Sequence, residues 1–171
     1  MVIGQLGGLP WNIPVDFRRF VRIVRQQPSN RFIMGRNVFH ELQALKLFPL
    51  TRAEHYIVSA DPDITTGVEG SVRVSSVDEF RRRIAAESAP GSVGAGNTVY
   101  VLGGERLYAE TISHASFLRV TQIHASFEGD RLFPEYRSSL QWVEMRRRDL
   151  TARDHRSGRL VSLSFVDYRR T

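Results

Sequence analysis

The chain has 171 residues, of which 42% are hydrophobic, so it can fold as one domain with a sizeable core. It contains no run of about 18 apolar residues, so no membrane-spanning helix is expected. The absence of cysteine excludes disulfides and thiolate metal sites. Because the first residues do not form the apolar block of a signal peptide, the expected compartment is the cytoplasm or the interior of an organelle.

The net charge is +6, with 24 lysines and arginines, nearly all of them arginine, against 18 acidic residues. This charge suits an anionic partner, either a nucleic acid or a phosphate-rich cofactor. A solvated, arginine-rich surface is an equally good explanation. The arginine runs at 81–83 and 146–148 are assigned to such a surface.

The first predicted element is a helix from Asp16 to about Gln27, with Pro14 just ahead of it and Pro28 after it. Apolar side chains recur at the spacing of one helix face: Phe17, Phe20, Val21 and Val24. Three arginines share another face: Arg18, Arg22 and Arg25.

Strands then alternate with helices. Apolar runs predict strands at 32–34, 56–58, 72–74, 99–102 and 117–123, and a last antiparallel pair at 142–145 and 160–168, joined by the polar segment 151–158. Helices are expected at 36–44, from a capping box at Ser76 and Glu79 to about residue 86, and from residue 105, with a flexible loop at 90–97. The prediction is a single α/β domain, residues 1–171, with a central, mostly parallel twisted sheet, helices on both faces and an antiparallel C-terminal hairpin.

Asp16 is the first candidate for chemistry. It follows a rigid segment that contains two prolines and Trp11, and it is expected to be a buried acid beside an aromatic wall, which can hold and protonate a flat, basic heterocycle. The alternative is an acid that only caps the helix or faces its dipole.

Two further candidates follow the ends of predicted strands. Gly103 and Gly104 lie between a strand and a helix, where backbone amides can approach a phosphate, although a tight turn needs the same residues. Arg36 begins a helix directly after the strand that ends at Gly35, and it suits a phosphate clamp or an ordinary surface position.

Three segments together resemble the dihydrofolate reductase family: 9–17 (LPWNIPVDF), 33–36 (IMGR) and 102–108 (LGGERLY). The resemblance runs over nearly the whole chain. It implies an NADPH-dependent oxidoreductase that reduces dihydrofolate to tetrahydrofolate by hydride transfer to the pterin ring. It also implies a monomer with no membrane partner. No two histidines have the spacing of metal ligands, so no metal is expected.

The resemblance also assigns residues. The matching catalytic positions are Asp16, Trp11, Leu9 and Thr121. Substrate contacts fall on Phe17, Phe20, Leu42, Leu50 and Leu102. Cofactor contacts fall on Ile3, Gly35, Arg36, Asn37, Ser59, Gly103, Gly104, Glu105, Arg106, Leu107 and Tyr108.

Particular roles follow from these matches. Asp16 would hydrogen-bond the pterin ring and support its protonation, with Trp11 ordering a water molecule near it. Thr121 would bridge this acid and the amino group of the pterin. Leu9 would lie in a mobile loop over the site, braced by Asp130. In the cofactor site, Arg36 would hold the adenosine 2′-phosphate and so select NADPH, and the two glycines would be joined by a cis peptide.

The chain departs from the family pattern at several places. The family's central first strand has no counterpart before Val2, so the sheet is expected to lack that strand or to be repaired by another segment. The arginine for the substrate's glutamate carboxylate falls on Ala53, with Arg52 one position early. Val38 replaces a threonine, and residues 43–46 are inserted. Since Ala53 offers no partner to the substrate's glutamate carboxylate, the affinity for folate is expected to be reduced.

These departures leave two alternatives to a dihydrofolate reductase. The chain can be a catalytically impaired binding module with the reductase fold, for RNA or a large assembly, as the arginine-rich surface also suggests. It can also be a reductase of another pteridine.

Overall fold

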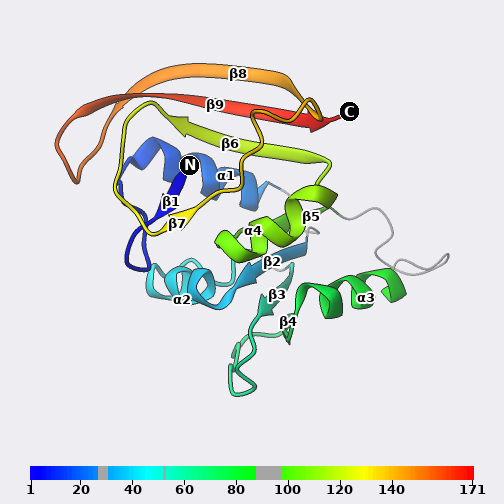
Figure 1. Cartoon of the computed structure of the whole chain (residues 1–171). Coiled ribbons are helices and arrows are strands. Elements are labelled where there is room, and N and C mark those ends of the chain that lie inside the picture. Colours follow the sequence, from blue (N-terminus) through cyan, green and yellow to red (C-terminus); the bar gives the residue numbers. More distant parts are fainter. Residues whose placement is uncertain (27–30, 52, 88–97) are drawn as a thin grey trace. The chain divides into compact units, whose positions relative to one another are not determined.

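The computed structural model describes residues 1–26, 31–51, 53–87 and 98–171 (Figure 1). The chain divides into two compact units. The first unit comprises Met1–Arg22 and Ile112–Thr171, and the second comprises Ile23–Thr111. The single-domain organisation stays a prediction. The expected loop at 90–97, the expected helix end at Gln27 and the position of Arg52 lie outside the described residues.

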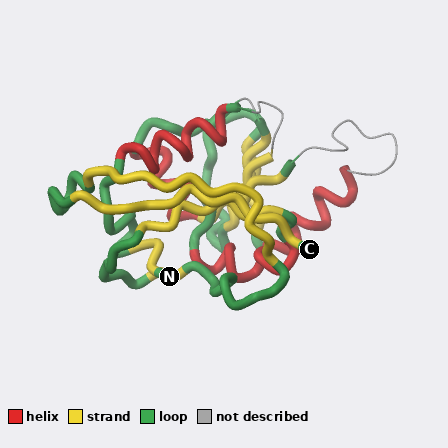
Figure 2. The backbone as a smooth tube through the Cα atoms, turned by 90° about the horizontal axis from the view of Figure 1, so that it is seen from above, coloured by secondary structure: helices red, strands yellow, loops and turns green. Residues whose placement is uncertain are grey.

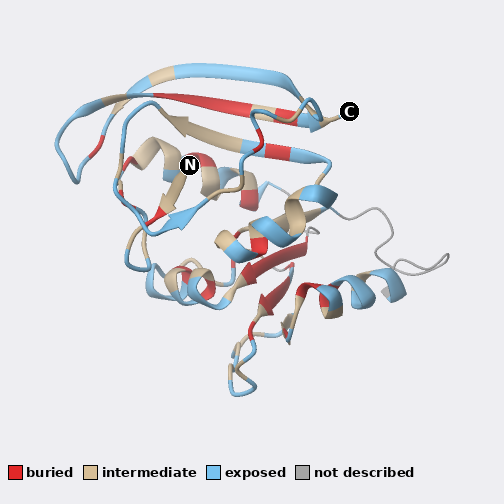
Figure 3. Cartoon of the chain, viewed as in Figure 1, coloured by how far each residue is buried: buried red, intermediate tan, exposed pale blue. Residues whose placement is uncertain are grey.

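The second unit contains a parallel sheet in the order β4-β3-β2-β5. Its strands are β2 (Arg31–Gly35), β3 (Glu54–Val58), β4 (Ser71–Val74) and β5 (Val99–Val101). The two inner strands are the most deeply buried, as Figure 3 shows. Their continuous apolar sequences fit strands that are covered on both faces.

Three helices belong to this unit: α2 (Arg36–Ala44), α3 (Val77–Glu87) and α4 (Glu105–Thr111). The predicted bounds of α2 are confirmed. At the start of α3, Ser76 Oγ accepts from the backbone N of Glu79 at 3.1 Å, as the capping box predicts. The Glu79 carboxylate, however, accepts from the N and Oγ of Ser75 instead of reaching Ser76. One half of the predicted box is therefore formed.

The first unit contains an antiparallel sheet in the order β6-β9-β8. Its strands are β6 (Phe117–Ile123), β8 (Trp142–Arg153) and β9 (Leu160–Arg170). The last two run side by side as a long twisted ribbon (Figure 2). The predicted antiparallel pair is confirmed, but β8 extends through Arg146–Arg148, which the sequence placed only on a solvated surface. All three arginines are exposed, and β8 is an edge strand of its sheet.

Three shorter elements complete the first unit. β1 (Val2–Gly4) pairs with β7 (Arg131–Leu132), and the 3-10 helix η1 (Ile112–His114) precedes β6. Gly129 lies so close to β1 that an added Cβ would be 2.4 Å from the Gly4 carbonyl oxygen. This approach requires glycine there.

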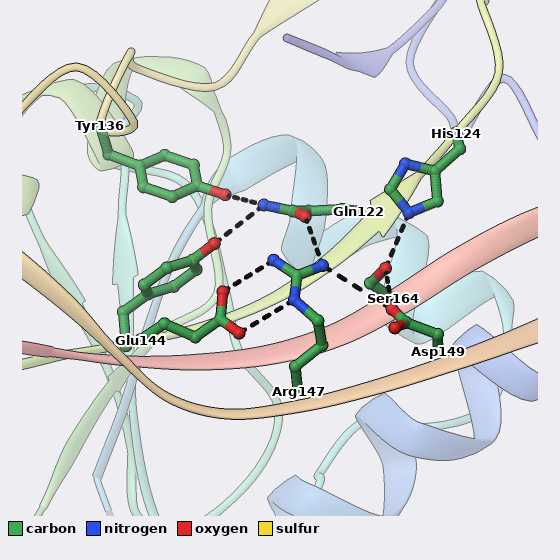
Figure 4. Close-up of polar contacts among 8 residues, drawn as sticks. Gln122, His124, Tyr136, Glu144, Arg147, Asp149 and Ser164 are labelled. Carbon is green, nitrogen blue, oxygen red and sulfur yellow. Dashed lines mark hydrogen bonds and ion pairs between the residues drawn. The ribbon is translucent and has the colours of Figure 1, made fainter.

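A polar network covers part of this sheet (Figure 4). Gln122 Nε2 donates to the hydroxyls of Tyr136 and Tyr168, both at 3.0 Å. Arg147 donates two hydrogen bonds to the Glu144 carboxylate, at 2.9 and 2.7 Å. Arg147 Nη1 also donates to Gln122 Oε1 at 3.5 Å, so the network joins β6 and β9 to β8.

His124 and Ser164 take part in a second contact of the same network. The Ser164 hydroxyl donates to Asp149 Oδ1 and lies 2.7 Å from His124 Nε2. Because the serine proton is directed to the aspartate, the histidine donates to serine and does not act as its base. Ser164 is buried, so we assign no nucleophilic role to its hydroxyl. The cluster stabilises the sheet.

The α/β fold class with a parallel sheet, antiparallel C-terminal strands and helices is confirmed. The strands, however, form three sheets instead of one central sheet. Among the described residues β5 pairs only with β2, and β6 only with β9. In the described part of the chain β5 and β6 are therefore edge strands of their own sheets.

Candidate active site

Asp16 lies in the first turn of α1 (Pro14–Arg25). The helix begins at Pro14, two residues earlier than predicted, because proline lacks only an N–H that the first turn leaves unpaired. The backbone N of Asp16 donates to the Ile13 carbonyl at 3.0 Å. The carboxylate is half-buried, so the expectation of a buried acid is corrected to one that water can also reach.

Trp11 contacts this carboxylate directly. Its Nε1 donates to Asp16 Oδ2 at 3.2 Å, where the resemblance implied an ordered water. The indole also packs against Phe127, with ring centroids 5.2 Å apart. Within the described part of the chain, Asp16 Oδ1 accepts no hydrogen bond, which leaves it available to a ligand.

The segment that carries Trp11 is anchored by Asp154, in the turn between β8 and β9. This carboxylate is 1% exposed and accepts from the backbone N of Asn12 at 2.8 Å and of Arg156 at 3.1 Å. Burial alone would raise the pKa of Asp154, but hydrogen bonds from Ser157, Asn12 and Arg156 outweigh it and hold the pKa below its usual value. Asp154 was not predicted, because Asn12, the partner that makes it an anchor, is 142 residues away along the chain.

Thr121 does not have the partner that the sequence predicted. Its Oγ1 accepts from Arg19 Nη1 at 3.1 Å, and the structure shows no hydrogen bond from Thr121 to Asp16. Arg19 was not predicted as a site residue. The available signal was its place on the helix, outside the face shared by Arg18, Arg22 and Arg25.

The remaining predicted residues of the first unit lie on α1, β1 and a loop. Phe17 and Phe20 have ring centroids 6.3 Å apart, and Phe17 is 38% exposed. Leu9 is 39% exposed, just after the loop, and Ile3 is half-buried on β1. These apolar side chains are partly open, as ligand contacts must be.

Asp130 has the position that the sequence predicted. Its Oδ1 accepts from the backbone N of Leu6 at 3.3 Å, and its own N donates to the Gly4 carbonyl at 3.0 Å. The carboxylate therefore lies against the loop that leads to Leu9.

In the second unit, Gly103 and Gly104 follow β5 and are joined by a cis peptide, as the resemblance implied. Gly103 has φ +101°, and a Cβ there would lie 2.7 Å from Tyr108 Cε2, so only glycine fits. A Cβ at Gly104 would meet nothing within 4 Å. The backbone N of Gly35 donates to the Gly103 carbonyl at 2.7 Å, which brings the ends of β2 and β5 together. The open space at Gly104 can admit a phosphate-bearing ligand.

α4 presents its predicted residues unequally. The Arg106 side chain is 93% exposed and pairs with Glu110 at 2.7 Å, and Glu105 begins the helix. Burial raises the pKa of the Tyr108 phenol from its usual value to about 12. The Leu107 side chain lies in the core and the residue is only 4% exposed, so the predicted cofactor contact would have to use its main chain.

Arg36 and Ser59 follow the ends of neighbouring parallel strands, where ligands bind in such sheets. Arg36 Nη1 lies 3.8 Å from Asp61 Oδ2, and Asn37 beside it is exposed. Ser59 is buried, and its Oγ accepts from the backbone N of Asp61 at 3.1 Å. Its predicted contact with a phosphate is therefore restricted.

Arg73 was not predicted. Its Nη1 donates to the Ser59 carbonyl at 2.8 Å, which places a second guanidinium at this end of the sheet. A charged residue between Val72 and Val74 in an apolar strand was the signal.

The predicted substrate contacts of this unit lie mostly inside it. Leu42 and Leu50 are 4% and 7% exposed, and Leu102 is half-buried. Ala53 is buried, so this position offers no group for a carboxylate, in agreement with the expected departure. Val38 is half-buried.

The described residues form neither a metal site nor a membrane-spanning helix. No group of three or more His, Asp or Glu side chains there is arranged to hold a metal ion. No helix there has the length and apolar character needed to cross a membrane.

Comparison with known proteins agrees with this arrangement. The family model for dihydrofolate reductase matches residues 1–170. The chain is 34% identical over 170 residues to dihydrofolate reductase HdrB of Haloferax volcanii, covering 99% of this chain and 77% of that protein. It is 32% identical over 138 residues to the dihydrofolate reductase of Bacillus subtilis (strain 168), covering 81% and 71%.

A solved structure is also similar. It is the dihydrofolate reductase from Enterococcus faecalis complexed with NADP(H) and RAB-propyl, with a TM-score of 0.71 and 28% identity, covering 99% of this chain and 89% of that one. With an acid in the first turn of α1 and paired glycines after β5, the chain belongs to the dihydrofolate reductase family.

Proposed function

We propose that Asp16 is the acid with which this family member reduces dihydrofolate to tetrahydrofolate, using NADPH. Membership of the family makes the chain an NADPH-dependent oxidoreductase. The proposal for Asp16 rests on one observation above all: Trp11 holds one carboxylate oxygen at 3.2 Å, and the other accepts no bond in the described part of the chain.

Asp16 acts on the pterin in two ways. A carboxylate accepts hydrogen bonds only, so it suits the amino group and a ring N–H of the pterin, which both donate. Its negative charge also stabilises the protonated ring, which is the better hydride acceptor. Thr121 adds a hydroxyl to this site, and Leu9, Phe17 and Phe20 contribute apolar surface.

NADPH supplies the hydride, and the second unit supplies the groups that fit its phosphates. The open space at Gly104 admits the pyrophosphate, with the exposed Arg106 near it. Arg36 is 52% exposed, and Arg73 adds a second positive charge at the same end of the sheet. These two guanidiniums favour the 2′-phosphate of NADPH. Tyr108 packs on Gly103 and is assigned to the nicotinamide end.

The finer assignments are part of the same proposal. The protein acts as a monomer in the cytoplasm on dihydrofolate or a closely related pteridine. A nucleic-acid-binding module is the rival, and the exposed arginines of β8 favour it.

The purified protein tests both functions. The proposal expects NADPH oxidation that depends on added dihydrofolate, slower oxidation of NADH, and a smaller preference for NADPH in Arg36→Leu. Arg137→Leu, on an exposed arginine elsewhere, is the matched control. If NADPH is not oxidised while RNA binds with a steep salt dependence, the binding module is the correct function. Light scattering gives the oligomeric state.

A further inference from the structure

Arg19 is a buried arginine, whereas the other arginines of α1 are exposed. It is 8% exposed, and it lies one turn after Asp16 on the same helix. Its Nη1 donates to Thr121 Oγ1 at 3.1 Å, and its Nη2 donates to Asp167 Oδ1 at 2.9 Å. The guanidinium thus links α1 to both β6 and β9.

The strands present these partners on one face. Thr121 on β6 is directly opposite Phe165 on β9, and Asp167 lies two residues further along β9. The Arg19 Cζ is 4.8 Å from the centroid of the Phe165 ring. One planar group therefore satisfies a hydroxyl, a carboxylate and an aromatic face together, an arrangement that a lysine ammonium cannot reproduce.

The charge of Arg19 is balanced within this cluster. Burial lowers the pKa of Arg19, and the carboxylates of Asp167 and Asp16 act in the opposite direction, while Arg119 lowers it further. Arginine remains charged under these conditions. Its hydrogen bonds to Thr121 and Asp167 are therefore always donated.

We infer that Arg19 is a positioning residue for the reaction, because it holds the Thr121 hydroxyl in the orientation that serves Asp16 and the pterin. This inference rests on the proposed role of Asp16. Arg19 acts through Thr121, and no contact with the substrate or the cofactor is assigned to it.

The hydrogen-bonding positions of the Thr121 hydroxyl give Arg19 this role. A threonine hydroxyl has one proton to donate and two acceptor positions. Arg19 has no acceptor, so it takes one of the two acceptor positions of Thr121 and cannot receive the proton. The proton is then directed to another acceptor, and the inference assigns this acceptor to Asp16, whose carboxylate acts on the charge of Arg19. The second acceptor position remains for the pterin amino group, which donates.

A matched set of variants separates this role from simple stabilisation. Arg19→Met removes both donated hydrogen bonds, and Thr121→Val removes the hydroxyl while keeping its shape. Arg119→Met is the control, since Arg119 is directly opposite Asp167 but exposed and makes no hydrogen bond to Thr121. For each variant the measurements are kcat, the KM for dihydrofolate, the Kd for NADPH and the melting temperature.

The expected result is a KM effect that passes through Thr121. Arg19→Met raises the KM for dihydrofolate roughly two- to tenfold, the effect of one hydrogen bond, with the NADPH Kd unchanged. Arg19→Lys recovers part of this loss, and Arg119→Met has no effect on KM. Arg19→Met combined with Thr121→Val has the same KM as Thr121→Val alone.

Two results overturn the inference. In the first, the KM increases of Arg19→Met and Thr121→Val multiply in the double variant, which would mean that the two residues act independently. The other is an equal KM increase in Arg19→Met and Arg119→Met, which would mean that charge near Asp167 is sufficient. If Arg19→Met does not fold, Arg19→Lys takes its place in the same double-variant comparison.

The failure of the proposed function looks different. If Asp16→Asn and Thr121→Val both keep normal turnover, the role of Asp16 is wrong. If both lose activity while the Arg19 variants keep a normal KM, only the role of Arg19 is wrong.

Discussion

We expect the burial of His55 to make the stability of the second unit dependent on pH. The side chain is fully buried, with its ring stacked on Phe32 at 5.5 Å between centroids and in edge contact with Phe48 at 5.0 Å. Its Nε2 accepts a hydrogen bond from the backbone N of Leu50 at 3.3 Å. The neutral ring therefore holds Leu50, which is one of the predicted substrate contacts, in place. Burial lowers the pKa of His55 from 6.5 to about 4.

The size of the effect follows from this pKa. Below pH 6.5 the unfolded chain takes up the proton and the folded chain does not, until the pH approaches about 4. The free energy of unfolding is therefore highest above pH 6.5 and falls as the pH decreases through this window. Since one pKa unit corresponds to about 1.4 kcal/mol, His55 alone removes about 3 kcal/mol. That is a large part of a typical stability of about 5–15 kcal/mol.

Urea unfolding at a series of pH values measures this loss. His55→Gln is the matched variant, because glutamine still offers an acceptor to Leu50 N but does not titrate in this range. Between pH 6.5 and about 4 the unmodified protein is expected to lose about 3 kcal/mol more than the variant. Equal pH dependence in the two proteins would show that the buried histidine does not control acid stability.

Three further predictions concern the site. Gly104→Ala should fold normally, because its Cβ meets no protein atom, but it should bind NADPH weakly, because the Cβ takes up space assigned to the phosphates. Normal NADPH affinity in this variant would contradict the phosphate assignment. Gly103→Ala should instead lower the melting temperature, because its Cβ would lie 2.7 Å from a tyrosine ring. Asp61→Asn removes the carboxylate 3.8 Å from Arg36 and should lower the Kd for NADPH more than for NADH, as titration of both cofactors measures. Asp154→Ala leaves buried donors unpaired, so it should lower the free energy of unfolding by about 1.5–3 kcal/mol, measured with urea at pH 7. The loss should be smaller at acid pH, because a carboxylate with a lowered pKa loses its contribution to stability as it is protonated. An unchanged stability would argue against the anchoring role of Asp154.

Local patterns predicted the elements whose side chains alternate between core and solvent. α2 begins after Gly35 and keeps Phe39 and Leu42 on one buried face, so its bounds agreed with the structure. The bounds of β6 also agreed. β8 did not, because an edge strand with arginines exposed on both faces has no apolar alternation to detect. β1 and β7 are too short to give a pattern.

The site was predictable only where single residues carry the signal. The family motifs identified Asp16, Trp11 and the paired glycines. Arg19 was missed because its partner Asp167 is 148 residues away, and Asp154 because Asn12 is 142 residues away. No local pattern encodes a hydrogen bond across such a separation. The inward side chain of Leu107 likewise depends on tertiary packing.

Steady-state kinetics of Asp16→Asn, beside direct NADPH titration of the same variant, tests the central claim most directly. The amide keeps the shape of the side chain and removes only its charge and one acceptor. The account predicts a loss of about 100-fold or more in kcat/KM for dihydrofolate at neutral pH, with NADPH bound as tightly as before. Turnover close to that of the unmodified protein, or equal losses in turnover and NADPH affinity, would contradict the account.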